Sequence, residues 1–117
     1  MRRFSAKEER RRLTASCLIG ASQPGPYVAL ENHLNYVYHA KRALSLDETY
    51  GLAALFNSAL LDRYFRTISG NTQVNATELR TMPLPALKMI AAIGRKIQAL
   101  PALAARVRKP DFQLKHA

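Results

Sequence analysis

Short polar side chains crowd the stretch 69–85, and their types suit recognition of nucleic acid better than covalent catalysis. Asparagine and glutamine can read adenine edges with two hydrogen bonds, and serine or threonine hydroxyls can hold phosphates. Arginines nearby in sequence could contact phosphates or guanine. The polar residues are Ser69, Asn71, Thr72, Gln73, Asn75 and Thr77, and the arginines are Arg63, Arg66 and Arg80. The stretch is predicted to be a recognition loop.

Turn and capping chemistry is the alternative interpretation of these residues. Gly70 is placed to end a helix, and Asn75 followed by Glu78 forms a capping box that would start another. Arg63 and Arg66 also suit the C-terminal end of a helix, and an aspartate stands four positions before Arg66. Both interpretations stay open from the residues alone.

The sequence carries no signature of a catalytic or metal site. It has no glycine-rich phosphate loop, no pair of Cys-x-x-Cys motifs and no His-Glu-x-x-His. His33 and His39 would share one face of a strand, but two histidines without an acidic cluster make a poor metal set. Cys17 lies in a strand-like pattern without a recognisable base, so we expect a core residue rather than a nucleophile. We predict no catalytic residue, no metal and no cofactor bound by this chain.

Charge is the strongest compositional feature. The 117 residues carry a formal net charge of +10 with a pI near 10.4. This balance favours a polyanionic partner, most often nucleic acid, although a solvated basic tail is the simpler alternative. No apolar run approaches the roughly 20 residues of a membrane span, no signal peptide is visible, and the single cysteine fits a reducing, cytoplasmic compartment. Six basic residues fall in the first dozen positions: Arg2, Arg3, Lys7, Arg10, Arg11 and Arg12.

Two strands and two long helices are expected to position the loop. Apolar and polar residues alternate over 12–19 and again over 27–39, which is typical of half-buried strands. Helical spacing of apolar residues over 45–68, opened by a capping box of Ser45 and Glu48, predicts one long helix. Pro83 and Pro85 hold the backbone extended after the loop. The fold class predicted is α+β, with a small mixed or antiparallel sheet packed by the long central helix.

A second helix over 86–100 shows the apolar seam of a helix that pairs with another helix. Its seam residues are Ala86, Ile90, Ile93, Ile97 and Leu100, and Pro101 should kink or restart it. The long helix carries a second apolar stripe of Leu61, Phe65 and Ile68, and a helix of this kind is normally covered on more than one side. We therefore expect part of the fold to come from a partner. The division expected is a partial DNA-binding domain over 1–85, a partner-pairing helical segment over 86–108 and a tail over 109–117.

Three blocks of the sequence resemble the target-recognition region of adenine-N6 DNA methyltransferases of bacterial restriction-modification systems, of the Eco57I-like and PaeR7I-like kind. They are RRFSAKEERRRL, LENHLNY, and GLAALFNSALLDRYFRTI followed by SGNTQVNATELRTMPLP. A related form of the last block also occurs in type I specificity subunits. The blocks stand in the family's order and span residues 2 to about 85.

The resemblance implies double-stranded DNA as a partner and a catalytic methyltransferase domain or subunit as another. In the family, that catalytic part binds S-adenosylmethionine through a glycine-containing loop and directs methyl transfer with an Asn-Pro-Pro-Tyr motif; this sequence has neither. What the resemblance implies for this chain is therefore limited to DNA recognition. We favour scaffolding and phosphate contact for the shared residues. They are Arg2, Arg3, Phe4, Lys7, Glu8, Asn32, His33, Asn35, Ser69, Gly70, Asn71, Thr72, Gln73, Thr77 and Glu78.

Three functions compete on the sequence alone. The first is the DNA-recognition fragment of an adenine methyltransferase, truncated or split from its catalytic half and inactive by itself. The second is an autonomous basic module that binds DNA or RNA with a steep salt dependence. The third is an interaction protein that works through the seam of the helix over 86–100.

Overall fold

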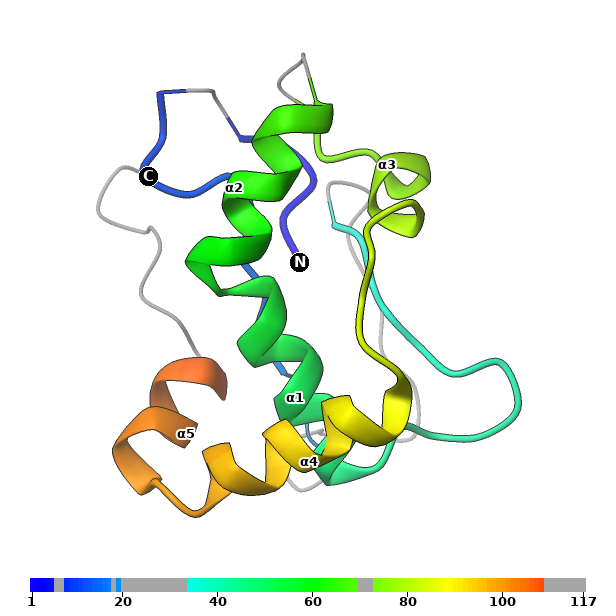
Figure 1. Cartoon of the computed structure of the whole chain (residues 1–117), viewed down its shortest axis with the longest axis vertical. Helices are drawn as coiled ribbons and strands as arrows, with labels where there is room; N and C mark the ends of the chain where they lie inside the picture. The colour runs from blue at the N-terminus through cyan, green and yellow to red at the C-terminus, as the bar shows by residue number, and fades with distance from the viewer. Residues whose placement is uncertain (6–7, 18, 20–33, 70–72, 109–117) are drawn as a thin grey trace.

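Five helices make up most of the described chain in a computed structural model (Figure 1). The structure describes residues 1–5, 8–17, 19, 34–69 and 73–108. The helices are α1 Leu46–Phe56, α2 Ala59–Ile68, α3 Ala76–Arg80, α4 Leu87–Gln98 and α5 Pro101–Arg108. Figure 1 shows α1 and α2 following each other as one column, with α4 crossing against α1. Within the described ranges, no helix combines the length and the apolarity needed to cross a membrane.

The described residues form no β-sheet, so the predicted α+β class is wrong. Only two isolated antiparallel bridges occur among them, Arg2 with Leu34 and Phe4 with Gln73. Residues 12–17 are irregular rather than a strand. Of the second predicted strand, residues 27–33 lie outside the described part of the chain, and 34–39 are non-helical with a single bridge at Leu34.

Side chains from the helices explain why the segment 12–17 forms no strand. The carboxylate of Asp62 accepts from the backbone N–H groups of Arg12 and Leu13, at 2.7 and 2.9 Å. The amide of Asn57 accepts from the Ala15 N–H at 2.9 Å and donates to the Ala15 carbonyl at 2.8 Å. A buried backbone must find hydrogen-bond partners, and here side chains take the place of a neighbouring strand.

The single long helix predicted over 45–68 is two helices. Asn57 ends α1, where its amide also donates to the Ala53 carbonyl at 2.8 Å. Ser58 caps α2 by accepting the Leu61 N–H on its hydroxyl oxygen. The Ser45–Glu48 capping box at the start of α1 is confirmed in both directions. The break follows from Asn57 and Ser58, two residues that compete with helix continuation through side-chain bonds to the backbone.

The seam helix pairs within the chain, as α4 against α1. Gly51 and Gly94 bring the two backbones into close contact, because a Cβ added at Gly51 would lie 2.0 Å from the Ile90 carbonyl oxygen and one at Gly94 1.7 Å from that of Asp47. Ile90 is buried at this contact. The partner-pairing role expected for this helix is therefore met by α1. The predicted restart at Pro101 is confirmed, since α5 begins there.

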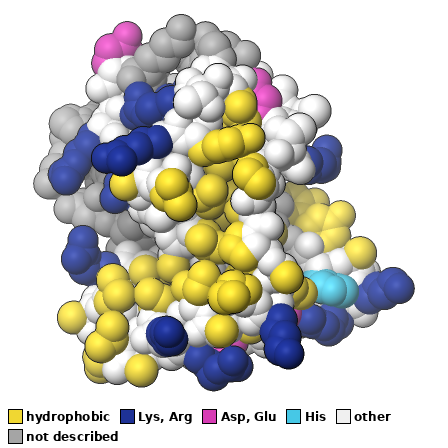
Figure 2. Space-filling model, viewed as in Figure 1, with side chains coloured by type: hydrophobic (Ala, Val, Ile, Leu, Met, Phe, Trp, Pro, Cys, Tyr) yellow, Lys and Arg dark blue, Asp and Glu magenta, His cyan; other side chains and the backbone are white. Residues whose placement is uncertain are grey.

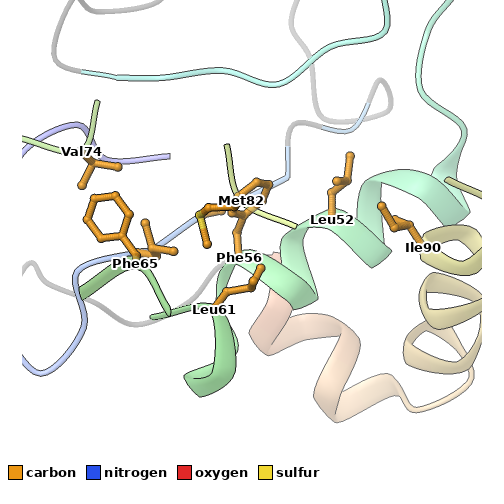
Figure 3. Packing of buried hydrophobic residues seen from close by; sticks show 9 residues of the cluster. Leu52, Phe56, Leu61, Phe65, Val74, Met82 and Ile90 are labelled. Carbon is orange, nitrogen blue, oxygen red and sulfur yellow. The ribbon is translucent and has the colours of Figure 1, made fainter. Parts of the chain in front are cut away.

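A continuous row of apolar side chains forms the main core (Figure 3). It runs from Val74 beside Phe65, past Met82 and Phe56, to Ile90 on α4. Each of these residues is buried. The remaining buried members are Leu13, Ala15, Leu52 and Leu61, and a smaller cluster joins α1 to α5 through Tyr50, Ala53, Ala104 and Val107.

Helix α2 is apolar on two sides, and the chain covers only one of them. Leu61 and Phe65 are buried in the main core. On another face, Leu60, Tyr64 and Ile68 are exposed, Leu60 to 74%. Of the predicted second stripe, Leu61 and Phe65 are therefore covered by other segments of this chain, and Ile68 is exposed.

Candidate nucleic-acid interface

The N-terminal segment is fastened to α2 by a network centred on one carboxylate. Asp62 Oδ1 accepts the two backbone N–H groups described above, and Asp62 Oδ2 accepts from Arg66 Nε at 2.9 Å. Arg66 Nη2 in turn donates to the Glu9 carbonyl at 2.6 Å. Burial opposes ionisation of Asp62, but the hydrogen bonds from Leu13, Arg66 and Arg12 outweigh it and hold the pKa of this carboxyl below its usual value.

Arg12 is a buried cation, contrary to the expectation of a basic cluster facing DNA. Arg12 is only 1% exposed. Its guanidinium lies 5.0 Å from the centre of the Phe65 ring, and its Nε donates to Ser5 Oγ at 3.2 Å. Burial lowers the pKa of Arg12, and the charge of Arg66 lowers it further, while Glu78 and Asp62 act in the opposite direction. An arginine keeps its charge even when its pKa falls, so Arg12 is a charged side chain held inside the protein. Because it is buried against Phe65 and Ser5, its role is structural.

Arg2 also serves the fold. Arg2 Nη1 forms an ion pair with Glu9 Oε2 at 2.8 Å, and Nη2 donates to the Arg11 carbonyl at 3.0 Å. Arg2, Arg12 and Arg66 together hold the turn of the N-terminal segment over α2. Of the six clustered basic residues, Lys7 lies outside the described part of the chain.

The cations that remain near this segment form a surface beside α2. Because Arg12 bonds to Asp62 and Arg66 bonds to Glu9, residues 9–12 run along 62–66. Arg10 and Arg63 are exposed there, and Arg11 is half-buried. On the face in Figure 2, basic side chains lie around the periphery and hydrophobic side chains fill the middle. We call Arg10, Arg11 and Arg63 the α2 basic patch; Arg66 is engaged by Asp62 and Glu9.

Segments from all three sequence blocks converge next to each other. The amide of Asn35 donates to the Val74 carbonyl at 2.8 Å, and the Asn35 N–H donates to the Met1 carbonyl at 2.9 Å. The Val74 N–H donates to the Arg3 carbonyl. With its oxygen turned toward Arg3, the Gln73 amide accepts from Nη2 at 2.9 Å and Nε at 3.0 Å. Residues far apart in sequence are thus brought into contact.

The recognition loop is only partly described. Gly70, Asn71 and Thr72 lie outside the described residues, as do Asn32 and His33. Asn75 caps α3 as predicted, but its side chain accepts the Thr77 N–H at 2.7 Å and does not form the predicted capping box with Glu78. Thr77 is exposed on α3.

Ser69 and Glu78 point inward rather than to solvent. Ser69 is buried, and neither its Oγ nor Glu78 Oε2 has a hydrogen-bond partner among the described residues. Pro83 and Pro85 are exposed between α3 and α4, and Arg80 is exposed at the end of α3. Glu8 is exposed, and Phe4 is partly exposed with the Arg3 guanidinium 5.9 Å from its ring centre.

Sequence reasoning missed the residues that hold the arrangement together. From the sequence, Asp62 is indicated only as the aspartate four positions before Arg66, and nothing singles out Asn57. Tyr36 and Tyr38 belong to the alternating pattern over 27–39 that predicted a half-buried strand, but both are exposed. Their period-two spacing with Leu34 was real, yet Leu34 is exposed as well, so the pattern gave no indication of burial.

Comparisons with known proteins identify the class of enzyme to which this helical, basic chain is related. It is 44% identical over 95 residues to the type II methyltransferase M.BsuBI of Bacillus subtilis. It is 36% identical over 96 residues to the type II methyltransferase M.PstI of Providencia stuartii. These alignments cover 81% and 82% of this chain but 19% of each relative, so the chain spans about a fifth of their length. No family model and no solved structure matches.

The chain is therefore related to one segment of type II methyltransferases of restriction-modification systems.

Proposed function

We propose that this chain is the DNA-recognition region of a site-specific adenine-N6 DNA methyltransferase of a restriction-modification system. The similarity to two type II methyltransferases over four-fifths of the chain carries the proposal. The convergence of segments from the three sequence blocks and the exposed arginines at positions 10 and 63 support it. Double-stranded DNA is the partner proposed, together with a catalytic domain or subunit.

The α2 basic patch is the surface proposed to lie along the phosphates. Arg63 is exposed, and the Asp62–Arg66 network fixes its helix against the N-terminal segment that carries Arg10 and Arg11. Phosphate contacts of this kind set register and orientation, while base edges are read by other groups. For Asn71, Thr72, Gln73 and Thr77, which the related sequences share, phosphate contact or a scaffolding role is proposed.

S-adenosylmethionine is proposed to bind elsewhere in the enzyme. Glu9, Asp47, Glu48 and Asp62 each form an ion pair with an arginine. Glu78 Oε2 is buried, and Glu8 is exposed. These carboxylates do not fit a cofactor site, so no chemical step is assigned to this chain.

Selection from duplexes with a randomised centre, followed by binding titrations across a salt series, tests the proposal. We expect enrichment of one adenine-containing site and a log–log salt slope of about −0.9 per phosphate neutralised. Replacing Arg10, Arg11 and Arg63 by alanine should make the slope shallower by up to about 3, because three phosphate contacts are lost. The matched control replaces the exposed Lys88, Lys96 and Arg106, which removes the same charge from α4 and α5.

Two results would contradict the proposal. Equal losses in the patch variant and the control would mean that net charge, not the α2 basic patch, binds DNA. Methyl transfer from labelled S-adenosylmethionine by the pure chain would contradict the assignment of catalysis to another part of the enzyme.

The other two functions remain distinguishable. An autonomous module would bind duplex tightly without site enrichment. The interaction protein is less well supported, because Ile90 and Ile97 of the proposed seam pack inside the chain.

A further inference from the structure

Helix α2 carries a row of apolar side chains that faces solvent. Leu60, Tyr64 and Ile68 are 74%, 38% and 37% exposed. Because they stand four residues apart, they follow one another along a single face of the helix. We call these three residues the α2 ridge. A row with this spacing is the feature that packs into the groove of a second helix, and exposed apolar side chains that cluster mark an interaction surface.

The α2 ridge is separate from the α2 basic patch, although both lie on the same helix. At about 100° of rotation per residue, the ridge falls between the exposed Arg63 on one side and the buried Leu61 on the other. The N-terminal segment, drawn in blue in Figure 1, is bonded to α2 through Asp62 and Arg66, which lie beyond Arg63. None of the three ridge residues is charged. DNA phosphates bind to cations, so the ridge suits a protein partner instead.

The size of the α2 ridge indicates what kind of protein partner it fits. Each partner of a stable specific complex buries about 800 Å², which is more than three partly exposed side chains can offer. The ridge alone would therefore not hold two free copies of this chain together. A segment attached to the same polypeptide needs a smaller contact, because attachment gives it a high effective concentration.

The relatives contain such an attached segment. The matched part is 19% of M.BsuBI and 19% of M.PstI, so most of each relative lies outside it. We propose that the α2 ridge docks against an apolar helix of this remaining part of a type II methyltransferase. The inference rests on the proposed function and adds the surface by which the chain is held to the rest of the enzyme. Docking there leaves Arg10 and Arg63 on a different side of α2, where they can reach phosphates.

Photo-cross-linking in a complete enzyme tests the docking. The enzyme is M.BsuBI with its matched segment exchanged for that of this chain, and benzoylphenylalanine replaces Tyr64. Irradiation without DNA should link position 64 to a peptide from the M.BsuBI part, identified by mass spectrometry. The same probe at Met89, which is exposed on α4, is the control and should give at most about a tenth of that yield.

A charge placed on the ridge separates docking from folding. Leu60 lies in the first turn of α2, where an aspartate is well tolerated by an isolated helix. Leu60→Asp should therefore shift the melting temperature of the separate chain by less than about 4 °C. In the chimera it should lower the cross-link from position 64 at least about tenfold, because a charge would enter an apolar contact. Met89→Asp makes the same change in the first turn of α4 and should leave the cross-link unchanged.

Several results would overturn the docking proposal. They are a cross-link to a second copy, recognised by mixing isotopically light and heavy enzyme, a cross-link only within this chain, and no cross-link at all. An equal loss in Leu60→Asp and Met89→Asp would overturn it as well. If the chimera does not accumulate, the whole chain is co-expressed with M.BsuBI lacking its matched segment, and absence of the same cross-link there is equally decisive.

The proposed function and this inference fail in different ways. A cross-link to the M.BsuBI part from a chain that binds no DNA would refute DNA recognition and leave the α2 ridge as a docking surface. DNA binding with site enrichment but without the cross-link would do the reverse.

Discussion

The two ends of the α1–α2 column are held by different kinds of contact. At the α2 end, Asp62 and Arg66 bind backbone groups of a segment that has no regular structure of its own. At the α1 end, Gly51 and Gly94 allow two regular helices to touch backbone to backbone. The first contact depends on directional hydrogen bonds and charge, and the second on the absence of side chains.

The difference has a physical consequence for tolerance to change. A glycine contact fails when any side chain is added, because backbone atoms cannot move aside as a flexible side chain can. A carboxylate contact can be weakened in two stages, because substitution by asparagine removes the charge and keeps the shape, whereas substitution by alanine removes both. Variants at the two ends should therefore respond in different ways.

The largest effect is expected from Gly94→Ala. The added Cβ would fall 1.7 Å from the Asp47 carbonyl oxygen, so α1 and α4 must separate. We expect a loss of about 3 kcal/mol in the free energy of unfolding, as for overpacked cores, despite the better helix propensity of alanine. Urea unfolding measures it. Lys88→Ala on the same helix is exposed and should change the value by less than about 0.5 kcal/mol.

A loss in Gly94→Ala no greater than that in the Lys88 control would mean that the helices separate freely. The close glycine contact would then not limit stability, and the comparison between the two ends would fail.

An effect nearly as large is expected from Asp62→Ala. This change leaves the buried N–H groups of Arg12 and Leu13 without their acceptor and Arg66 without its counter-ion, at a cost of about 2–3 kcal/mol. Asp62→Asn keeps an acceptor of the same shape and should cost about half as much. The midpoint of urea unfolding gives both values.

Equal losses in the alanine and asparagine variants would show that the charge of Asp62, and not its bonds to the backbone, fixes the N-terminal segment.

The smallest effect on stability is expected from lowering the pH. It should involve a carboxyl on each helix of the column, Glu48 on α1 and Asp62 on α2. Hydrogen bonds from the Arg42 side chain, with one from the Ser45 backbone, lower the pKa of Glu48 from its usual 4.5 to about 2. Asp62 is shifted in the same direction. A carboxyl with a lowered pKa stabilises the fold fully above its usual pKa, and this contribution is lost as the pH falls through the folded value. Thermal unfolding should therefore move to lower temperature as the pH falls from about 4.5 to about 2.

Glu48→Gln and Asp62→Asn should each flatten part of that pH dependence, because the substituted amides do not titrate. An unchanged dependence in both variants would assign the acid sensitivity to other groups.

Local features of the fold followed from the sequence. The caps at Ser45 and Asn75 and the restart at Pro101 were predicted and are confirmed. Leu13 and Ala15 are apolar positions of the alternation over 12–19 that predicted a half-buried segment, and both are buried. The prediction of a sheet was wrong. Alternating apolar residues indicate that one side of a segment is buried, but they do not indicate which groups form hydrogen bonds with its backbone. The site residues at positions 70–72 stay predictions.

Sequence alone determined the features whose partners lie within a few residues. A capping hydroxyl reaches an N–H three positions on, and a proline acts on its own backbone, so both can be read locally. Tertiary structure decided which groups satisfy the extended N-terminal segment. Arg12 bonds to a residue 50 positions away and Ala15 to one 42 away. A backbone N–H can donate to a strand carbonyl, a carboxylate or an amide oxygen, and only folding brings one of these acceptors within reach.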